Sequence, residues 1–277
     1  MRAPTGLPHL GRTAVVGVVN VTPDSFSDGG RYYDEGAAVR HGLELLAEGA
    51  DLVDVGGEST RPGAQRVDAD EELRRVRGVV TALAAAGAVV SIDTTRSAVA
   101  AAAVDAGARV VNDVSAGVVD PHMSKVVAAC DVPFVLMHSR GPSADMATRA
   151  VYGDVVAEVT AELREAVARA VDAGVRPERI AVDPGLGFAK AAEHNLALLR
   201  DLPAFMNALE CPVMIGASRK SFLGTVLDGR AVGDRDDATQ AITALAAWQS
   251  VWAVRVHAVR AAADAVRVVA AIQHGAP

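Results

Sequence analysis

Short apolar, β-branched runs alternate with helical patterns along this chain, and no other feature restricts its fold so strongly. Strands that alternate with helices predict a parallel sheet covered by helices. Eight strands are predicted, at residues 14–20, 52–55, 89–93, 109–112, 134–138, 180–183, 213–216 and 253–257. Helices are predicted after them, among others at residues 35–48, 71–86, 96–106, 155–173, 238–249 and 259–273.

Eight βα units in 277 residues are the count of a closed (β/α)8 barrel, the TIM barrel, which typically takes about 250 residues. An open, doubly wound α/β sheet is the alternative. No linker divides the chain, so residues 1–277 are expected to form one domain, with residues 1–13 as a leader ahead of the first strand. The connections that leave the strands are longer and more polar than those that enter them. This places the functional face at the carboxyl end of the barrel.

Glycine and aspartate mark several helix boundaries. Gly87, Gly107 and Gly174 each follow a helical pattern and are expected to end it in the left-handed conformation. Asp236 and Asp237 are expected to provide the N-cap of the helix that follows them.

Charge and composition limit the partners and the compartment. The formal net charge of −7 argues against a general nucleic-acid or membrane-surface binder, because both need a basic face. Cys130 and Cys211 have no C-x-x-C spacing and are expected to be small buried residues in a reduced compartment. The first 13 residues lack the apolar run of a signal peptide, and polar residues interrupt the apolar stretch at 241–259. A cytoplasmic protein without a membrane span is therefore expected.

Polar residues at the ends of three predicted strands form the first candidate site. Asp183 precedes Pro184-Gly185, a pair typical of a type II turn, and Asp93 and Asn112 end two earlier strands. Carboxylates accept hydrogen bonds and amides also donate them, so together they suit a flat heterocycle with a guanidine-like edge. Two alternatives remain. Asp183 could merely cap a turn, or the two acids could bind a metal with Asp113, although histidine partners are missing.

Cations are predicted at the same face of the barrel. Arg61 follows Thr60 and precedes a Pro-Gly turn, which favours phosphate contact over a solvated surface arginine. Arg255 and His257 alternate on one strand, so both point to the barrel interior, and burial of Arg255 requires a bound phosphate or a structural acid. Lys220 lies in a loop, where a charge role is favoured over a Schiff base. These cations form a local cluster that an acidic protein needs in order to hold a polyphosphate.

Two further residues have weaker signals. Asn20 opens a long polar loop, typical of a lid or of disorder, and its amide oxygen suits Mg²⁺, which keeps several waters and binds phosphate jointly with few protein groups. His138 follows the fifth predicted strand and is expected to be structural or peripheral.

Seven stretches resemble the dihydropteroate synthase family, the folate-pathway enzymes that sulfonamides inhibit. They are GVVNVTPDSFSDGG (17–30), DVGGESTRPGA (54–64), SIDTTR (91–96), VNDVSAG (111–117), DPGLGFAK (183–190), GASRKSFLG (216–224) and RVH (255–257). The resemblance covers nearly the whole chain. It implies a (β/α)8-barrel transferase that joins 6-hydroxymethyl-7,8-dihydropterin diphosphate to p-aminobenzoate and releases diphosphate. It also suggests a homodimer formed through outer helices.

The resemblance implies a role for each matching residue. The pterin would be held by Asp93, Asn112, Asp183 and Lys220. The diphosphate would be bound by Thr60, Arg61, Arg255 and His257, and Mg²⁺ would be ligated by Asn20. The p-aminobenzoate pocket would be shaped by Phe26, Pro62, Phe188, Arg219 and Ser221. The catalytic residues would be Asp28, Lys220 and Arg255, with Asp28 near the carbon that becomes cationic.

The implied reaction is an SN1-like, Mg²⁺-assisted displacement, in which cations neutralise the departing diphosphate. Two residues depart from the family pattern. Ala258 stands where Asp is usual, which bears on the orientation and charge of His257, and Ser250 stands where Gly is common. Two other functions remain open: a methyltetrahydrofolate-binding methyltransferase, which needs no diphosphate cluster, and a catalytically inactive pterin-binding relative.

Overall fold

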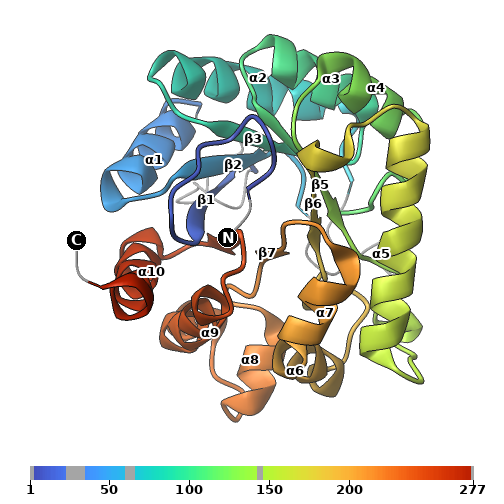
Figure 1. Ribbon diagram of the computed structural model, residues 1–277. Coiled ribbons are helices and arrows are strands. Elements are labelled where there is room, and N and C mark those ends of the chain that lie inside the picture. The colour runs from blue at the N-terminus through green and yellow to red at the C-terminus, as the bar shows by residue number, and fades with distance from the viewer. Residues whose placement is uncertain (1–2, 23–34, 60–65, 142–145, 276–277) are drawn as a thin grey trace.

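Eight parallel strands form a nearly closed barrel in the structure, a computed structural model that describes residues 3–22, 35–59, 66–141 and 146–275 (Figure 1). The strands are β1 Ala14–Asn20, β2 Leu52–Gly56, β3 Val90–Asp93, β4 Val110–Asp113, β5 Phe134–Met137, β6 Ile180–Asp183, β7 Met214–Ile215 and β8 Ala253–Val256. Their order in the sheet is β6-β5-β4-β3-β2-β1-β8-β7. A parallel bridge between Val182 and Val213 links the two edges, and Val182 N–H donates to the Pro212 carbonyl at 2.9 Å. The closed barrel is therefore confirmed over the open sheet.

Helices surround this barrel on its outer side (Figure 1). They are α1 Glu35–Glu48, α2 Ala69–Ala85, α3 Ser97–Asp105, α4 Met123–Cys130, α5 Val155–Asp172, α6 Ala192–Arg200, α7 Leu202–Leu209, α8 Ser221–Val226, α9 Asp236–Trp248 and α10 Val259–His274. Each predicted helix is present, with ends within two residues of those expected. Among the described helices, none is long and apolar enough to cross a membrane.

The predicted helix boundaries are confirmed at the glycines and wrong at one N-cap. Gly87, Gly107 and Gly174 have φ angles of 86°, 113° and 103°, the left-handed conformation that ends a helix. The N-cap of α9 is Arg235, and no side chain caps this end. Asp236 lies inside the helix, where Arg219 engages its carboxylate. A long-range ion pair has thus taken the oxygens that a cap would use.

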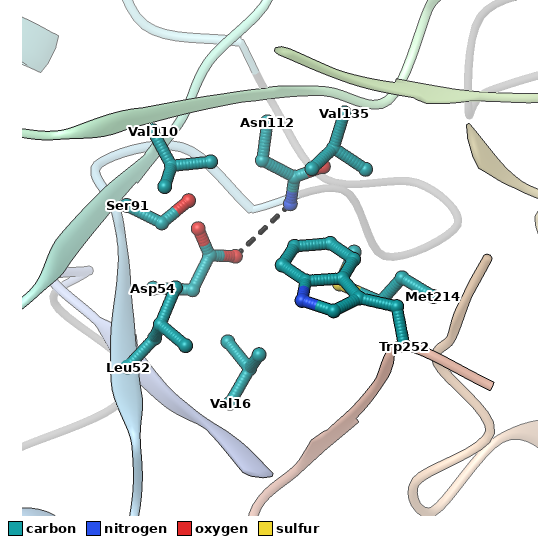
Figure 2. A pocket seen from close by; sticks show the side chains of 9 residues that line it. All are labelled: Val16, Leu52, Asp54, Ser91, Val110, Asn112, Val135, Met214 and Trp252. Carbon is teal, nitrogen blue, oxygen red and sulfur yellow. Dashed lines mark hydrogen bonds between the residues drawn. The ribbon is translucent and has the colours of Figure 1, made fainter. Parts of the chain in front are cut away.

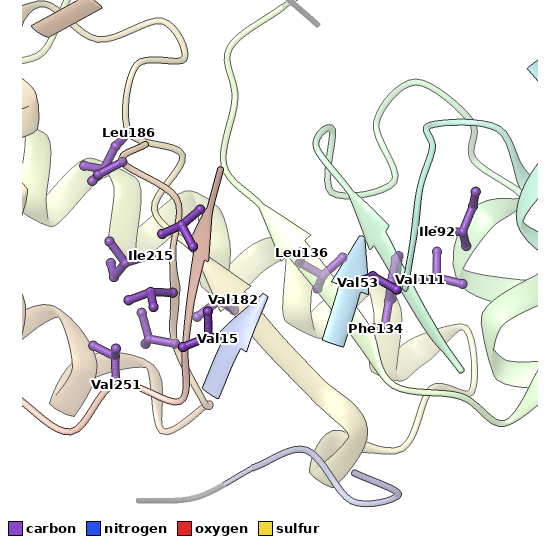
Figure 3. Close-up of a cluster of buried hydrophobic side chains, with 14 of the residues drawn as sticks. Val15, Val53, Ile92, Val111, Phe134, Leu136, Val182, Leu186, Ile215 and Val251 are labelled. Atoms are coloured by element: carbon purple, nitrogen blue, oxygen red, sulfur yellow. The ribbon is translucent and has the colours of Figure 1, made fainter. Parts of the chain in front are cut away.

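The alternation of side chains along the strands produces two apolar cores. Residues that face outward pack against the helices and form the larger core, part of which Figure 3 shows: Val15, Val53, Ile92, Val111, Leu136, Val182 and Ile215. Residues that face the barrel interior form a smaller cluster at the amino ends of the strands: Ala14, Val16, Leu52, Val110, Val135, Ala181, Met214, Trp252 and Ala253. Period-two alternation assigns each strand residue to one of these two layers, and Trp252, which precedes β8, joins the interior cluster from outside the strand.

The leader closes the amino end of the barrel. Ala3, Leu7 and Leu10 pack against the interior cluster. Arg12 binds both carboxylate oxygens of Asp51 at 2.7 and 2.8 Å, which fixes the leader to the start of β2. With this end sealed, a ligand reaches the interior from the carboxyl ends of the strands, the face predicted from the sequence.

Both cysteines are half-buried, whereas full burial was expected. Neither Cys130 nor Cys211 takes part in a disulfide among the described residues.

Candidate active site

The carboxyl ends of four strands place polar side chains in the barrel interior. Asp93 on β3 pairs in register with Asn112 on β4, so these two side chains are neighbours on the same face. Asp183 ends β6, and Arg255 lies on β8. Asn112 and Asp183 are buried, at 3% and 2% exposure. The three residues predicted to read a heterocycle therefore lie at one end of the barrel with a cation beside them.

Asp54 on β2 connects this group, and the sequence interpretation missed it. One of its carboxylate oxygens, Oδ2, accepts hydrogen bonds from Arg255 Nε at 2.6 Å and from Asn112 Nδ2 at 3.0 Å. Arg255 also donates from a terminal nitrogen to Asp93 Oδ2 at 2.8 Å. The sequence required either a bound phosphate or a structural acid as the partner of a buried Arg255. The structure provides two structural acids, Asp54 and Asp93. The signal for Asp54 was its alternation with Leu52 and Gly56, which places a charged residue on the interior face of an apolar strand.

Two buried acceptor atoms in this network have no hydrogen-bond partner among the described residues. They are Asp54 Oδ1 and Asn112 Oδ1. Figure 2 shows both side chains, joined by their one hydrogen bond, beside a small cavity whose lining includes Ser91 and Trp252. Buried polar atoms in folded proteins almost always have a hydrogen-bond partner. We therefore expect these two oxygens to accept a hydrogen bond from a ligand or from water.

Asp183 and Arg255 lie close together, separated by Gly216. A β-carbon at Gly216 would be 3.4 Å from Asp183 Oδ2, 3.9 Å from Arg255 Cβ and 3.9 Å from Lys220 Nζ. Gly185 fixes the backbone turn that follows Asp183. It has a φ of +67°, and its N–H donates to Asp183 Oδ1 at 2.7 Å. An added β-carbon at Gly185 would lie 1.9 Å from the His138 carbonyl oxygen, so only glycine fits.

Lys220 reaches the interior from the loop after β7. Its ammonium donates to the Leu186 carbonyl and lies 4.6 Å from the centre of the Phe188 ring, within cation–π range. Burial lowers the pKa of Lys220 to about 8, while the Asp183 carboxylate opposes that shift. This ammonium therefore faces an acid and a ring, an environment that suits a charge role.

The interior carries more acid than base. Burial raises the pKa of Asp93 to about 7, the Arg255 charge opposes the rise, and the Asp54 carboxylate adds to it. Burial also raises the pKa of Asp183, against the nearby Lys220. These three carboxylates face two cations, which leaves an excess of one negative charge when all are ionised. A ligand edge that carries N–H donors and positive character relieves that excess.

His257 lies just beyond β8, two residues after Arg255 and hence on the same face of the strand. Its ring Nδ1 is 2.9 Å from Ser218 Oγ, and its backbone N–H donates to the same hydroxyl at 3.2 Å. Ser218, which the sequence interpretation did not single out, therefore orients the imidazole. The hydroxyl of Ser218 thus contacts His257 at two points, the ring and the backbone N–H, from the neighbouring strand end, whereas position 258 carries an alanine.

The remaining predicted residues are more scattered. Phe188 is half-buried beside Lys220, and Asn20 is half-buried at the end of β1. Arg219 binds Asp236 through two hydrogen bonds of 2.7 Å, and Ser221 is exposed at the start of α8. Five predicted residues lie outside the described residues: Phe26, Asp28, Thr60, Arg61 and Pro62.

Two other sequence hypotheses concern Asp113 and His138. The carboxylate of Asp113 accepts bonds from Ser115 N, Ser115 Oγ and Gly117 N at 2.7 to 2.8 Å, so a local turn uses its oxygens. Within the described part of the chain, no group of three or more His, Cys, Asp or Glu residues is arranged to hold a metal. His138 is buried between Glu162 and Lys190, in the structural environment that was expected.

Comparison with known proteins identifies the family. The profile of the family described as "Pterin binding enzyme" matches residues 16–257. The chain is 54% identical to the dihydropteroate synthase of Mycobacterium leprae over 274 residues, which cover 97% of this chain and 96% of that protein. It is 42% identical to the dihydropteroate synthase of Bacillus subtilis over 258 residues, 93% of this chain and 87% of that one.

Solved structures agree with this assignment. The dihydropteroate synthase of Xanthomonas albilineans with 4-aminobenzoic acid has a TM-score of 0.89 and 45% identity, over 96% of this chain and 94% of that one. The Yersinia pestis enzyme in a sulfonamide drug complex has a TM-score of 0.91 and 37% identity, over 98% of both chains. This chain therefore belongs to the family of pterin-binding enzymes, among the dihydropteroate synthases, which are transferases of folate biosynthesis.

Proposed function

We propose that the interior site joins 6-hydroxymethyl-7,8-dihydropterin diphosphate to p-aminobenzoate and releases diphosphate. The observation that carries this proposal is the meeting of buried acids, a buried amide and two cations at the open end of one barrel. Acids and the amide suit the pterin, and the cations suit its leaving group.

The pterin edge is assigned to Asp183, Asn112 and Asp93. Asp183 Oδ2 and Asn112 Oδ1 face ligand donors, because Asp183 Oδ1 is taken by Gly185 and the Asn112 amide nitrogen by Asp54. Because the Asp54 carboxylate holds the amide nitrogen of Asn112, the amide oxygen is directed toward the ligand. It therefore favours a hydrogen-bond donor of the ligand over an acceptor. This arrangement favours the N–H-rich edge of a pterin.

The diphosphate is assigned to Arg255 and His257, with Thr60 and Arg61 from the second loop. Asp54 and Asp93 engage Arg255 through its Nε and one terminal nitrogen, and a guanidinium has five N–H groups. The remaining N–H groups are available to a phosphate oxygen, while the two acids fix the plane of the guanidinium. A cation held in place in advance stabilises the charge that develops on the leaving group.

The p-aminobenzoate pocket is assigned to Phe188, Arg219 and Ser221, with Phe26 and Pro62. Departure of the diphosphate leaves a positive carbon that shares its charge with the pterin ring and with Asp28, and the aniline nitrogen then attacks it. The aniline need not lose a proton before it attacks. The sulfonamide complex of the Yersinia pestis enzyme supports a further proposal, that sulfonamides bind this pocket in place of p-aminobenzoate.

Mg²⁺ is proposed as the cofactor, with Asn20 as its protein ligand. Asn20 ends β1 beside Gly56 and offers a neutral oxygen at the open end of the barrel. A single neutral donor fits an ion that keeps several waters and is shared with a diphosphate. When bound, the ion would neutralise charge on the diphosphate. Replacement of Asn20 by Ala should raise the Mg²⁺ concentration needed for half-maximal rate, while the exposed Asn207→Ala should leave it unchanged.

The test of the reaction uses the purified protein with the pterin diphosphate, p-aminobenzoate and Mg²⁺. We expect dihydropteroate and diphosphate in equal amounts, measured by chromatography and a diphosphate-release assay. Omission of p-aminobenzoate should abolish dihydropteroate. Pterin binding without release of diphosphate would instead identify an inactive relative, and methyl transfer from methyltetrahydrofolate would identify the methyltransferase. Rescue of a host that lacks the synthase, on folate-free medium, tests the same activity in cells.

A homodimer in the cytoplasm is proposed for the working protein. Four apolar side chains on the adjacent helices α9 and α10 are 52 to 65% exposed: Leu245, Trp248, Val268 and Ile272. Apolar exposure gathered on two helices is typical of an interface. Sedimentation equilibrium should give a dimer that Trp248→Glu dissociates and that Val118→Glu, an exposed change elsewhere, does not. Cell fractionation would test the proposed compartment.

A further inference from the structure

Lys190, the last residue of the 183–190 stretch, has no role in the proposed function. Its charged side chain is nevertheless buried, at 8% exposure. Its ammonium donates to His138 Nδ1 at 2.8 Å, to the Phe188 carbonyl at 3.0 Å and to the Gly185 carbonyl at 3.1 Å. An ammonium has three N–H groups, and each has one acceptor here. The side chain thus folds back to hold the backbone of its own loop.

A second anchor holds this loop from the side of α5. Tyr152 donates from its hydroxyl to the Ala189 carbonyl at 3.0 Å. The Arg140 guanidinium lies 3.9 Å from the centre of the Tyr152 ring and binds Glu162. Glu162 also bonds His138 Nε2 at 2.9 Å, which completes a ring of contacts that returns to Lys190.

The loop requires such anchors because its backbone is unusual. Gly185, Gly187 and Ala189 have φ angles of +67°, +79° and +46°. The left-handed conformation disfavours Ala189, so the surrounding contacts have to hold it. The same loop presents the Leu186 carbonyl and the Phe188 ring to Lys220. Whatever fixes this loop therefore also fixes the contact between Phe188 and Lys220.

We propose that Lys190 is a positioning residue for the p-aminobenzoate half of the site, acting through the Gly185 and Phe188 carbonyls to hold the Phe188 ring against Lys220. This rests on the proposed roles of Phe188 and Lys220. Of the residues assigned to the pterin edge, Asp93 and Asn112 lie on β3 and β4, and only Asp183 contacts this loop, through the Gly185 N–H. Loss of Lys190 should therefore affect p-aminobenzoate more than the pterin.

Protonation of Lys190 controls how many of these bonds it makes. Burial, and after it the charge of Lys220, lowers the pKa of Lys190 to about 7, while Asp183 and Glu162 oppose the shift and Arg140 adds to it. The hydrogen bond from His138 lowers the pKa of Glu162 to about 2, and burial lowers the pKa of His138. A neutral His138 that donates from Nε2 to Glu162 presents Nδ1 as an acceptor to Lys190.

Loss of the ammonium proton removes one of the three donors and leaves an acceptor unpaired. The loop is consequently held best below about pH 7 and loosens as the pH rises through that value. We expect the KM for p-aminobenzoate of the unmodified protein to rise between pH 6 and pH 8.5. In Lys190→Met it should already be high at pH 6 and should lack the rise centred near pH 7, so that only the change due to Lys220, whose pKa is about 8, remains.

The experiment compares Lys190→Met with Tyr152→Phe, which removes only the hydroxyl bond to Ala189. At pH 6.5 we expect about a tenfold rise in the KM for p-aminobenzoate in Lys190→Met and about a threefold rise in Tyr152→Phe, with the KM for the pterin diphosphate within threefold of normal. Lys125→Met, an exposed lysine on α4, should leave both unchanged. If Lys190→Met does not fold, the pH series on the unmodified protein retains the test, because a KM for p-aminobenzoate that does not rise between pH 6 and pH 8.5 would overturn the role of Lys190.

Each outcome decides one question. Equal rises in both KM values, or no change in either, would overturn the positioning role of Lys190. Phe188→Ala separates this failure from that of the proposed site. If Phe188→Ala raises the KM for p-aminobenzoate and Lys190→Met does not, the site assignment stands and the role of Lys190 is wrong. If Phe188→Ala also has no effect, the p-aminobenzoate pocket lies elsewhere.

Discussion

Replacement of Asp54 by Ala is the perturbation that tests the interior network most directly. The Asp54 carboxylate is 1% exposed and accepts bonds from both Arg255 and Asn112. Its removal deletes a charge-assisted hydrogen bond of about 1.5–3 kcal/mol and leaves a buried amide donor unpaired at about 1–3 kcal/mol. The free energy of unfolding should therefore fall by about 4 kcal/mol, within the range expected when a buried ion pair loses one partner.

The activity should fall for the same reason. Without Asp54, Arg255 retains only Asp93 as a partner, and the Asn112 amide is free to turn its nitrogen toward the ligand. Loss of one preorganised charge contact typically costs about 3 kcal/mol of barrier, which is roughly a hundredfold in rate. We expect kcat/KM for the pterin diphosphate to fall by that factor, while the KM for p-aminobenzoate changes little.

Asp51→Ala is the matched control, because it breaks another Asp–Arg pair at the opposite end of the barrel. Asp51 binds Arg12 at 2.7 and 2.8 Å and lies beside the leader, away from the site. Denaturant unfolding should show a loss of stability in both variants. Steady-state kinetics should show a loss of kcat/KM only in Asp54→Ala. Equal kinetic effects would refute the idea that Asp54 orients the site.

Three further predictions concern single residues. Asp183→Asn should abolish pterin binding, because the amide presents a donor where the ligand presents donors; unchanged affinity by calorimetry would remove Asp183 from the pterin site. The pKa of Asp93 is raised to about 7, so pterin affinity should increase as the pH rises from 6 to 8 and the carboxylate loses its proton, and Asp93→Asn should remove that dependence. Ser250 has a φ of +60°, where glycine is less strained, so Ser250→Gly should raise the free energy of unfolding by about 0.5–1 kcal/mol, and a lower melting temperature would contradict this.

The helix and strand pattern could be predicted well because it is local. Strand parity depends on residues two apart, and helix ends depend on single glycines such as Gly107. The prediction that Asp236 caps α9 was wrong because of a contact that is not local. Its carboxylate was expected to cap α9, yet Arg219, 17 positions away in the chain, binds it in the folded protein. A local rule does not foresee a competing partner of this kind.

The sequence by itself determined the eight strands, the polar residues at their ends and the family resemblance, because each of these is a property of adjacent or regularly spaced residues. Tertiary structure decided which of those residues meet. Arg255 binds Asp54 across 201 positions, Ser218 contacts the His257 imidazole across 39 positions, and Lys190 turns back to hold its own loop. Partner choice among buried charges depends on barrel closure and strand register, which set distances between residues that the chain keeps far apart.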